Sequence, residues 1–240
     1  MFGFFSKRNI VASGILSSMI DIHSHILYGV DDGAQKAESS KAIFDVYKEM
    51  GITKIFCTPH IKLSMPDNDP QSLKQKFELF KIEFPNMEMR LAAEYMLDEC
   101  FSHMTEDKEI LSYDGEHVLV ELYRRNTLEE IYDKLFGIVV KGYTPVLAHP
   151  ERYLSFSMRD LLTIKDRGVL FQLNMPSLTD YYGEVVGRRS KEFFDADIYD
   201  FVATDFHDVS QMYHILSLTT GRKDRKRFEK LIDNNRSLWI

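Results

Sequence analysis

The sequence has few cysteines, no excess of basic residues and no long apolar run, and each shortage excludes a class of protein. Its two cysteines, Cys57 and Cys100, lie far apart and outside any CxxC pair. This argues against a zinc ribbon and a disulfide framework and favours a reducing, cytoplasmic location. The net charge of -7 makes nucleic acid an unsuitable partner, because polyanions bind to basic surfaces. The apolar stretches before residue 20 are short or interrupted by serine and glycine, so no transmembrane segment is expected.

The chain is long enough for one sizeable core, because 44% of its 240 residues are hydrophobic. We expect residues 1–18 to form an N-terminal leader of uncertain order and residues 19–240 to form a single domain. A contact of Phe2, Phe4 and Phe5 with a membrane surface or a partner is the alternative to a frayed terminus. The sequence contains no linker, internal repeat or low-complexity segment.

Short apolar runs alternate with segments of helical periodicity, which is typical of repeated βα units around a largely parallel sheet. The predicted strands are residues 19–22, 54–57, 87–93, 118–122, 145–148, 169–173 and 201–203. Helices are predicted over residues 41–50, over 72–84, and after Thr127, which forms a capping-box pattern with Glu130. The number of strands indicates an α/β barrel or near-barrel.

Side chains that bind metals follow or end almost every predicted strand. They are His23, His25, His60, Glu94, Glu121, His149, Asp205 and His207, and the sixth strand has Asn174 instead. The C-terminal ends of parallel strands converge on one edge of a barrel, and residues two apart in a strand point to the same side. Imidazole and carboxylate suit zinc, manganese and iron(II). We therefore predict a metal cluster, and assign no role to His103, His117 and His214, since an isolated histidine is usually a surface or core residue.

Five segments together resemble the polymerase-and-histidinol-phosphatase (PHP) superfamily. They are DIHSH at residues 21–25, GVDDG at 29–33, CTPH at 57–60, HPERY at 149–153 and TDFH at 204–207. Within the superfamily, the GVDDG and HPERY segments look most like the bacterial tyrosine-protein phosphatases of capsule and exopolysaccharide loci. The resemblance runs from about residue 19 to about residue 207.

This resemblance implies a distorted (β/α)7 TIM-like barrel that holds three divalent ions, often manganese, with iron or zinc as alternatives. The implied substrate is phosphotyrosine on a protein partner, a bacterial tyrosine autokinase. One ion would be held by His23, His25, Glu94 and Asp205, a second by Glu94, Glu121 and His149, and a third by Asp32, His60 and His207. Asp31 replaces Asp32 if the loop register differs by one.

The same resemblance names Arg152, Asp205 and His207 as catalytic residues, with Arg152 gripping the phosphate through its bidentate donors. A surface ion pair is the alternative role for this arginine. The family often has a second arginine shortly after the last histidine, but no arginine follows His207 closely here. Arg188 and Arg189 are the candidate substitutes.

Other functions remain open on the same scaffold. The substrate could be a small phosphoester such as histidinol phosphate or a nucleotide, or the chain could be an inactive regulatory module, and the oligomeric state is open. A cysteine-dependent phosphatase is excluded, because that mechanism needs an arginine six residues after the cysteine, where Leu63 and Glu106 stand. Tyrosines that could contact a phosphotyrosine ring, or merely pack, are Tyr28, Tyr123, Tyr153, Tyr181 and Tyr182.

Overall fold

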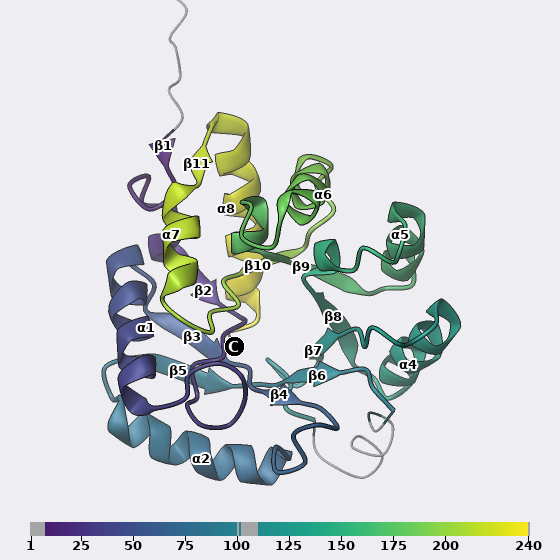
Figure 1. Cartoon of the computed structure of the whole chain (residues 1–240), viewed down its shortest axis with the longest axis horizontal. Coiled ribbons are helices and arrows are strands. Elements are labelled where there is room, and N and C mark those ends of the chain that lie inside the picture. Colours follow the sequence, from purple (N-terminus) through teal and green to yellow (C-terminus); the bar gives the residue numbers. More distant parts are fainter. Residues whose placement is uncertain (1–7, 100, 102–109, 240) are drawn as a thin grey trace, which may run out of the picture.

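Parallel strands occupy the centre of the computed structural model, which describes residues 8–99, 101 and 110–239 (Figure 1). One sheet has the strand order β10-β9-β8-β7-β6-β4 and another the order β2-β3-β5, and every neighbouring pair in them is parallel. The strands are β2 Ile20–Asp21, β3 Lys54–Cys57, β4 His60–Ile61, β5 Glu88–Leu91, β6 Glu94–Met96, β7 His117–Glu121, β8 Thr144–Ala148, β9 Leu170–Asn174 and β10 Phe201–Ala203. The prediction of an α/β fold with parallel strands is confirmed.

The two sheets are continuous through the chain, because β3 leads into β4 and β5 leads into β6 after two residues each. Backbone hydrogen bonds cross the same junctions: the Ala92 N–H donates to the Cys57 carbonyl at 3.0 Å, and the Glu94 N–H to the Pro59 carbonyl at 3.1 Å. An isolated parallel bridge joins Ser24, just after β2, to Phe206, just after β10. The segments that follow the first and last strands of the parallel set therefore lie side by side.

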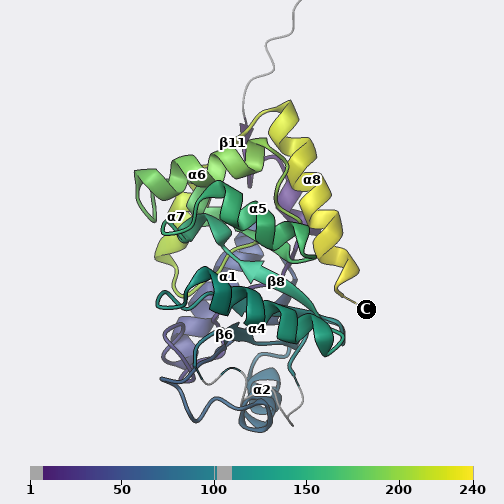
Figure 2. The ribbon, with the colours of Figure 1, turned by 90° about the vertical axis from the view of Figure 1, so that its right-hand side faces the viewer.

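Helices surround the strands (Figure 1), and α4, α5 and α6 lie together on one flank (Figure 2). The helices are α1 Ala37–Met50, α2 Pro70–Glu83, α4 Leu128–Val140, α5 Met158–Asp166, α6 Glu184–Asp195, α7 Ser210–Ser217 and α8 Arg222–Ser237, with short 3-10 helices η1 Ile15–Ser18, η2 Pro150–Arg152 and η3 Met175–Leu178. The predicted capping box is confirmed at α4, where the Glu130 N–H donates to Thr127 Oγ1 at 3.2 Å and the Thr127 N–H to Glu130 Oε2 at 2.6 Å. Helices α5 to α8 had no counterpart in the sequence prediction.

Apolar side chains of the strands divide between two clusters. One is built mainly from the strands: Ile20, Ile22, Phe56, Ala92, Leu119, Val146, Ala148, Phe201 and Ala203. Their sequence neighbours Ile55, Cys57, Val120 and Leu147 belong to the larger cluster shared with the helices. Successive side chains of a strand point to opposite sides, and both sides are buried here, which explains why the strands read as unbroken apolar runs.

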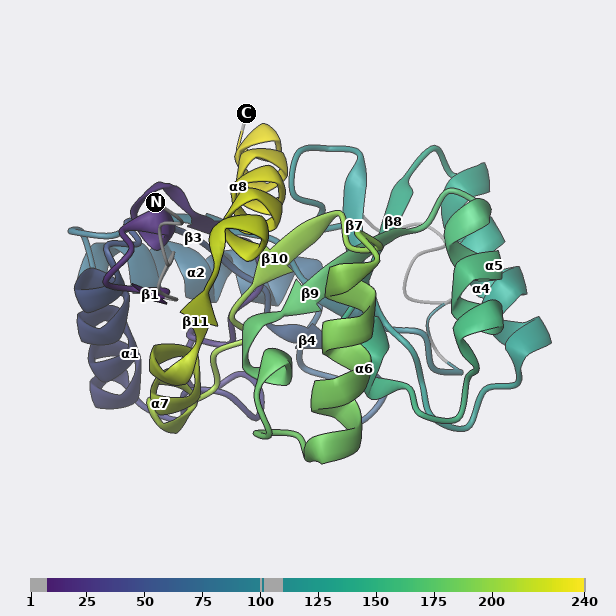
Figure 3. The same ribbon diagram turned by 90° about the horizontal axis from the view of Figure 1, so that it is seen from above.

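Part of the segment expected to be a leader belongs to the packed structure. Strand β1 (Arg8–Asn9) pairs antiparallel with β11 (Thr219–Thr220), and Ile10 and Leu16 are buried. These apolar side chains anchor residues 8–18 to the C-terminal region, and Phe2, Phe4 and Phe5 lie outside the described residues. Helix α8 packs on β10 and β2, and Figure 3 shows it beside β10. Within residues 8–99, 101 and 110–239, no helix is both long and apolar enough to cross a membrane.

Candidate metal centre

Four buried side chains from three separate parts of the chain converge on one point. His23 Nε2 lies 3.1 Å from His25 Nε2, and both nitrogens lie 3.3 Å from Glu94 Oε2. Asp205 Oδ1 lies 3.3 Å from His23 Nε2 and 3.4 Å from His25 Nε2. The two histidines follow β2, Glu94 follows β5 and is the first residue of β6, and Asp205 follows β10, so the segments just after three parallel strands supply the whole group.

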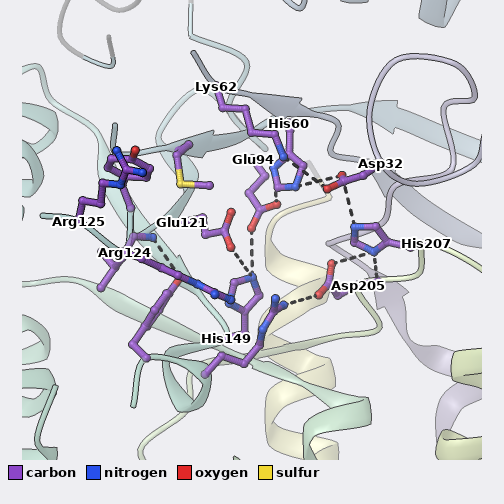
Figure 4. Close-up of a pocket in the computed structure, with 15 residues that line it drawn as sticks. Asp32, His60, Lys62, Glu94, Glu121, Arg124, Arg125, His149, Asp205 and His207 are labelled. Atoms are coloured by element: carbon purple, nitrogen blue, oxygen red, sulfur yellow. Dashed lines mark hydrogen bonds and ion pairs between the residues drawn. The ribbon is translucent and has the colours of Figure 1, made fainter. Parts of the chain in front are cut away.

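Glu94 also faces a second group of candidate ligands (Figure 4). Its Oε1 lies 3.2 Å from His149 Nε2, which is in turn 3.9 Å from Glu121 Oε1. His60 approaches from the other side, with Nδ1 3.0 Å from Glu94 Oε2. A single carboxylate therefore lies between two sets of nitrogen and oxygen donors.

A third group lies around Asp32, whose Oδ1 is 3.4 Å from His60 Nε2 and 3.7 Å from His207 Nε2. The rings of His25 and His207 stack with centroids 4.0 Å apart. The candidate ligands form three sets, and within each set the ligand atoms lie within 4.8 Å of one another. The sets are His25, Asp32, His60 and His207; His23, His25 and Glu94; and His60, Glu94 and Glu121. All nine side chains predicted as ligands thus meet, and His25 and His60 each belong to two of the sets instead of the one expected.

The loop of residues 31–33 is fixed against His25. Asp31 Oδ2 accepts hydrogen bonds from His25 Nδ1 at 2.8 Å and from the His60 backbone N–H at 3.1 Å, and its Oδ1 accepts from the Gly33 N–H at 3.0 Å. A Cβ at Gly33 would lie 2.1 Å from the His25 carbonyl oxygen, so only glycine fits. Asp31 is buried and points behind His25, whereas Asp32, 56% exposed, points into the cluster.

Two residues of the cluster have backbone conformations that side chains disfavour. His149 has φ 37° and Asp205 has φ 53°, both in the left-handed region. Such residues persist only where the surroundings hold them, and they concentrate at functional sites. Each one is the first or second residue after a buried strand, where the chain must turn sharply to aim its ligand into the cluster.

The cluster forms the floor of a pocket of about 430 Å³. The pocket is lined by Asp32, His60, Lys62, Glu94, Met96, Glu121, Leu122, Tyr123, Arg124, Arg125, His149, Arg152, Tyr153, Asp205 and His207. Arg152 reaches Asp205 Oδ2 with Nη1 at 3.1 Å and covers the ring of Tyr182 at 4.6 Å. The pocket therefore presents a cationic group directly beside the candidate metal ligands.

The comparison with protein families agrees with this geometry. The family model described as "Capsular polysaccharide synthesis, CpsB/CapC" matches residues 19–237. The chain belongs to the CpsB/CapC family.

Named relatives of this CpsB/CapC chain are tyrosine phosphatases. It is 30% identical to the tyrosine-protein phosphatase CpsB of Streptococcus pneumoniae, over 92% of this chain and 98% of that protein. It is 28% identical to the tyrosine-protein phosphatase YwqE of Bacillus subtilis, over 80% of this chain and 78% of the relative. Its fold matches a crystal structure from work on YwqE and CpsB, described as unique metal-dependent tyrosine phosphatases, with a TM-score of 0.75 and 24% identity over 92% of this chain and 94% of the other.

The ionised carboxylates of the CpsB/CapC site need nearby positive charge to be stable. Burial alone would lower the pKa of His23, but Glu94 and Asp205 outweigh it and raise that pKa to about 9. Burial opposes ionisation of Glu94 and Asp205 as well, yet the facing histidines hold both carboxyl pKa values well below their usual range. Burial and the charge of Glu94 raise the pKa of Glu121 to about 8. Protons or divalent cations can supply the positive charge that this arrangement stabilises.

Two other histidines of the site are held neutral. Burial lowers the pKa of His149 to about 4, aided by Arg152, and burial lowers the pKa of His60 to about 4. His149 Nδ1 has no hydrogen-bond partner among the described residues, and His60 Nδ1 has only the close approach of Glu94 Oε2 at 3.0 Å. A neutral imidazole with a free lone pair is the form that binds a metal ion.

Several contacts of the site were missed by sequence reasoning. His23 Nδ1 lies 3.0 Å from Gln172 Oε1 on β9, so Gln172 accepts the Nδ1 proton and turns the Nε2 lone pair toward the cluster. Asn174 donates to Asp205 Oδ2 at 2.8 Å. Gln172 lies in the predicted strand 169–173 and Asn174 directly follows it, and this spacing of two residues was the available signal.

The remaining sequence candidates lie elsewhere or play other parts. Arg189 donates to the carbonyls of Tyr153 and Phe156 at 3.1 and 2.7 Å, and neither it nor Arg188 lines the pocket. Of the five tyrosines, Tyr123 and Tyr153 line the pocket and Tyr182 contacts Arg152, whereas Tyr28 donates to Glu83 and Tyr181 packs on Tyr182 and His214. His117 is paired with Asp114 at 2.8 Å. Cys57 is fully buried in β3, and Cys100 and His103 lie outside the described residues.

Proposed function

We propose that this chain is a metal-dependent phosphatase that hydrolyses phosphotyrosine on a protein partner. The observation that carries the proposal is the convergence of Glu94 and Asp205 on His23 and His25, whose Nε2 atoms lie 3.1 Å from each other and within 3.4 Å of both carboxylates. The names of the CpsB and YwqE relatives support the substrate class. Following the same resemblance, we propose a tyrosine autokinase as the partner and the cytoplasm as the location.

The side chains fit divalent cations by their chemistry. Gln172 and Asp31 accept the Nδ1 protons of His23 and His25, so the two Nε2 lone pairs face each other and two carboxylates. Four electron-pair donors at such distances repel one another unless protons or a cation lie between them. Mixed imidazole and carboxylate ligands suit manganese, iron or zinc.

We propose three ions, manganese first. His23, His25, Glu94 and Asp205 would hold one, and Glu94, Glu121 and His149 a second. Asp32, His60 and His207 would hold the third, with His60 close enough to Glu94 to serve the second as well. Asp31 is proposed as a hydrogen-bond support for His25 in place of a ligand, because all three of its contacts are to N–H groups.

The protein residues have separable roles in the reaction. Bound divalent ions would supply an activated water and neutralise charge on the phosphoryl oxygens. Arg152, which faces Asp205 at 3.1 Å, is placed to bind phosphoryl oxygens with its planar donors. Asp205 and His207 line the same pocket, and we propose that they act on the phosphate through the ions that they would hold. No cysteine nucleophile is needed, and burial raises the pKa of the Cys57 thiol.

We also propose that the parallel strands close into the distorted (β/α)7 barrel that the resemblance implies. Support comes from the Ser24–Phe206 bridge and from backbone hydrogen bonds beside it, where the His25 N–H donates to the Phe206 carbonyl and the Asp205 N–H to the His23 carbonyl, both at 2.9 Å. These bonds connect the two ends of the strand order.

Metal loading and hydrolysis measured together test the function. The purified protein should contain manganese, iron or zinc and should hydrolyse a phosphotyrosine peptide. Chelator should remove metal and activity in parallel, and manganese should restore both. Turnover that survives complete metal removal contradicts the proposal. A higher kcat/KM on histidinol phosphate or a nucleotide than on the peptide would favour the small-molecule alternative.

A further inference from the structure

A pair of arginines stands at the mouth of the pocket on the turn between β7 and α4. Arg124 and Arg125 line the pocket and are exposed. Figure 4 shows them on the opposite side of the pocket from Asp32 and His207, with Glu121 between. They therefore lie beyond the metal cluster, where the parts of a substrate that surround its phosphate would lie.

The turn that carries these arginines is anchored on both sides. The Asn126 N–H donates to the Tyr123 carbonyl at 3.0 Å, which closes a β-turn with the arginines at its two central positions. The Asn126 side chain donates to the Leu97 carbonyl, and Lys134 Nζ reaches the same carbonyl at 3.0 Å. On the preceding side, the Leu122 N–H donates to the Tyr153 hydroxyl at 3.1 Å. The backbone beneath the two guanidinium groups is thus fixed before any ligand binds.

Neither arginine is neutralised by the part of the chain that the structure describes. Arg124 and Arg125 have no ion pair with a carboxylate there, whereas Arg227 pairs with Asp195 and Asp197 at 3.0 and 2.9 Å. Two neighbouring arginines without a carboxylate partner attract anions locally, even though the protein has a net charge of -7.

We infer that Arg124 and Arg125 select phosphotyrosine segments with acidic residues next to the phosphotyrosine. This inference rests on the proposed function. A phosphate at the metal cluster leaves the adjoining peptide at the pocket mouth, and a glutamate or aspartate there meets a guanidinium whose planar donors match a carboxylate. Because the turn is anchored, little backbone ordering entropy opposes the contact.

The test compares two phosphotyrosine peptides of equal length, one with glutamates and one with glutamines beside the phosphotyrosine, on the manganese-loaded enzyme. We expect kcat/KM to favour the acidic peptide about tenfold at low salt, a difference of ~1.4 kcal/mol, and the preference to shrink as salt rises. Arg124→Gln with Arg125→Gln should abolish the preference. Hydrolysis of p-nitrophenyl phosphate, which has no flanking residues, should stay unchanged.

Arg159→Gln with Arg188→Gln is the matched control, since it removes the same charge from exposed positions outside the pocket lining. Equal loss of preference in the control, or no preference in the wild type, overturns the inference. Loss of p-nitrophenyl phosphate hydrolysis in the Arg124/Arg125 variant also overturns it, because the pair would then bind the phosphate itself. If neither peptide is hydrolysed, the proposed function fails, and the binding constants of the two peptides still decide the role of the arginines.

Discussion

Replacing Asp31 and Asp32 separately should damage the protein in different ways, although the two residues are adjacent. Asp31→Ala removes the acceptor of three N–H groups, those of the His25 ring, the Gly33 backbone and the His60 backbone. At about 1 kcal/mol net for each lost hydrogen bond, the metal-free protein should lose ~3 kcal/mol of stability. For a chain of this size, that corresponds to a fall in Tm of roughly 6–12 °C.

Asp32→Ala should leave the metal-free protein almost unchanged, because the Asp32 side chain is 56% exposed and its contacts are to His60, Lys62 and His207 at the pocket surface. A change of less than ~0.5 kcal/mol is expected. Its metal affinity should fall instead, because a proposed ligand is removed. Asp31→Ala should weaken manganese binding as well, by about 10–100-fold, since His25 loses the acceptor that orients its ring.

Thermal unfolding of chelator-treated protein and calorimetric titration with manganese measure the two effects independently. Asp31→Asn serves as the milder variant, because its amide oxygen still accepts from His25 while the other oxygen is lost. Equal Tm values for Asp31→Ala and Asp32→Ala in the absence of metal would refute the reasoning. So would full manganese affinity in Asp32→Ala.

Three further variants test other parts of the site. Arg152→Lys should lower kcat/KM on p-nitrophenyl phosphate by about tenfold or more, because lysine lacks the bidentate donors, while the amount of bound metal should stay unchanged. Unaltered kinetics would mean that Arg152 serves only in its ion pair with Asp205. Cys57→Ser should keep most activity while losing ~1 kcal/mol of stability, because a hydroxyl replaces a buried thiol; near-complete inactivation would implicate the thiol in the reaction. Glu151→Gln should stabilise the protein relative to the wild type more at pH 8 than at pH 5. Burial raises the pKa of Glu151 to about 7, above the ordinary value of about 4.3. The native state therefore binds more protons than the unfolded state between these values, and wild-type stability falls as pH rises through that window. The variant should gain up to roughly 3 kcal/mol on the wild type by pH 8 in urea unfolding, and a constant difference across the window would contradict this.

Much of the site could be read from the sequence because its signals are local. A short apolar run followed by histidine or a carboxylate identifies both a strand and the ligand at its end, and the two-residue spacing of His23 and His25 fixes their common side. The capping box of α4 is local in the same way. The helices after β8 were harder to predict from the sequence, because their apolar faces can be recognised only when the strands that they cover are known.

The sequence by itself determined which residue types serve the site and that parallel strand ends bring them together. Only the tertiary structure decided that Asp31 turns back to support His25 while Asp32 faces the cluster, and that His60 lies between two ligand sets. It also decided that Arg124 and Arg125, at no recognisable spacing from any ligand, share the pocket. The physical reason is range: backbone periodicity and strand order act over a few residues, whereas these contacts depend on how loops from distant strands pack against one another.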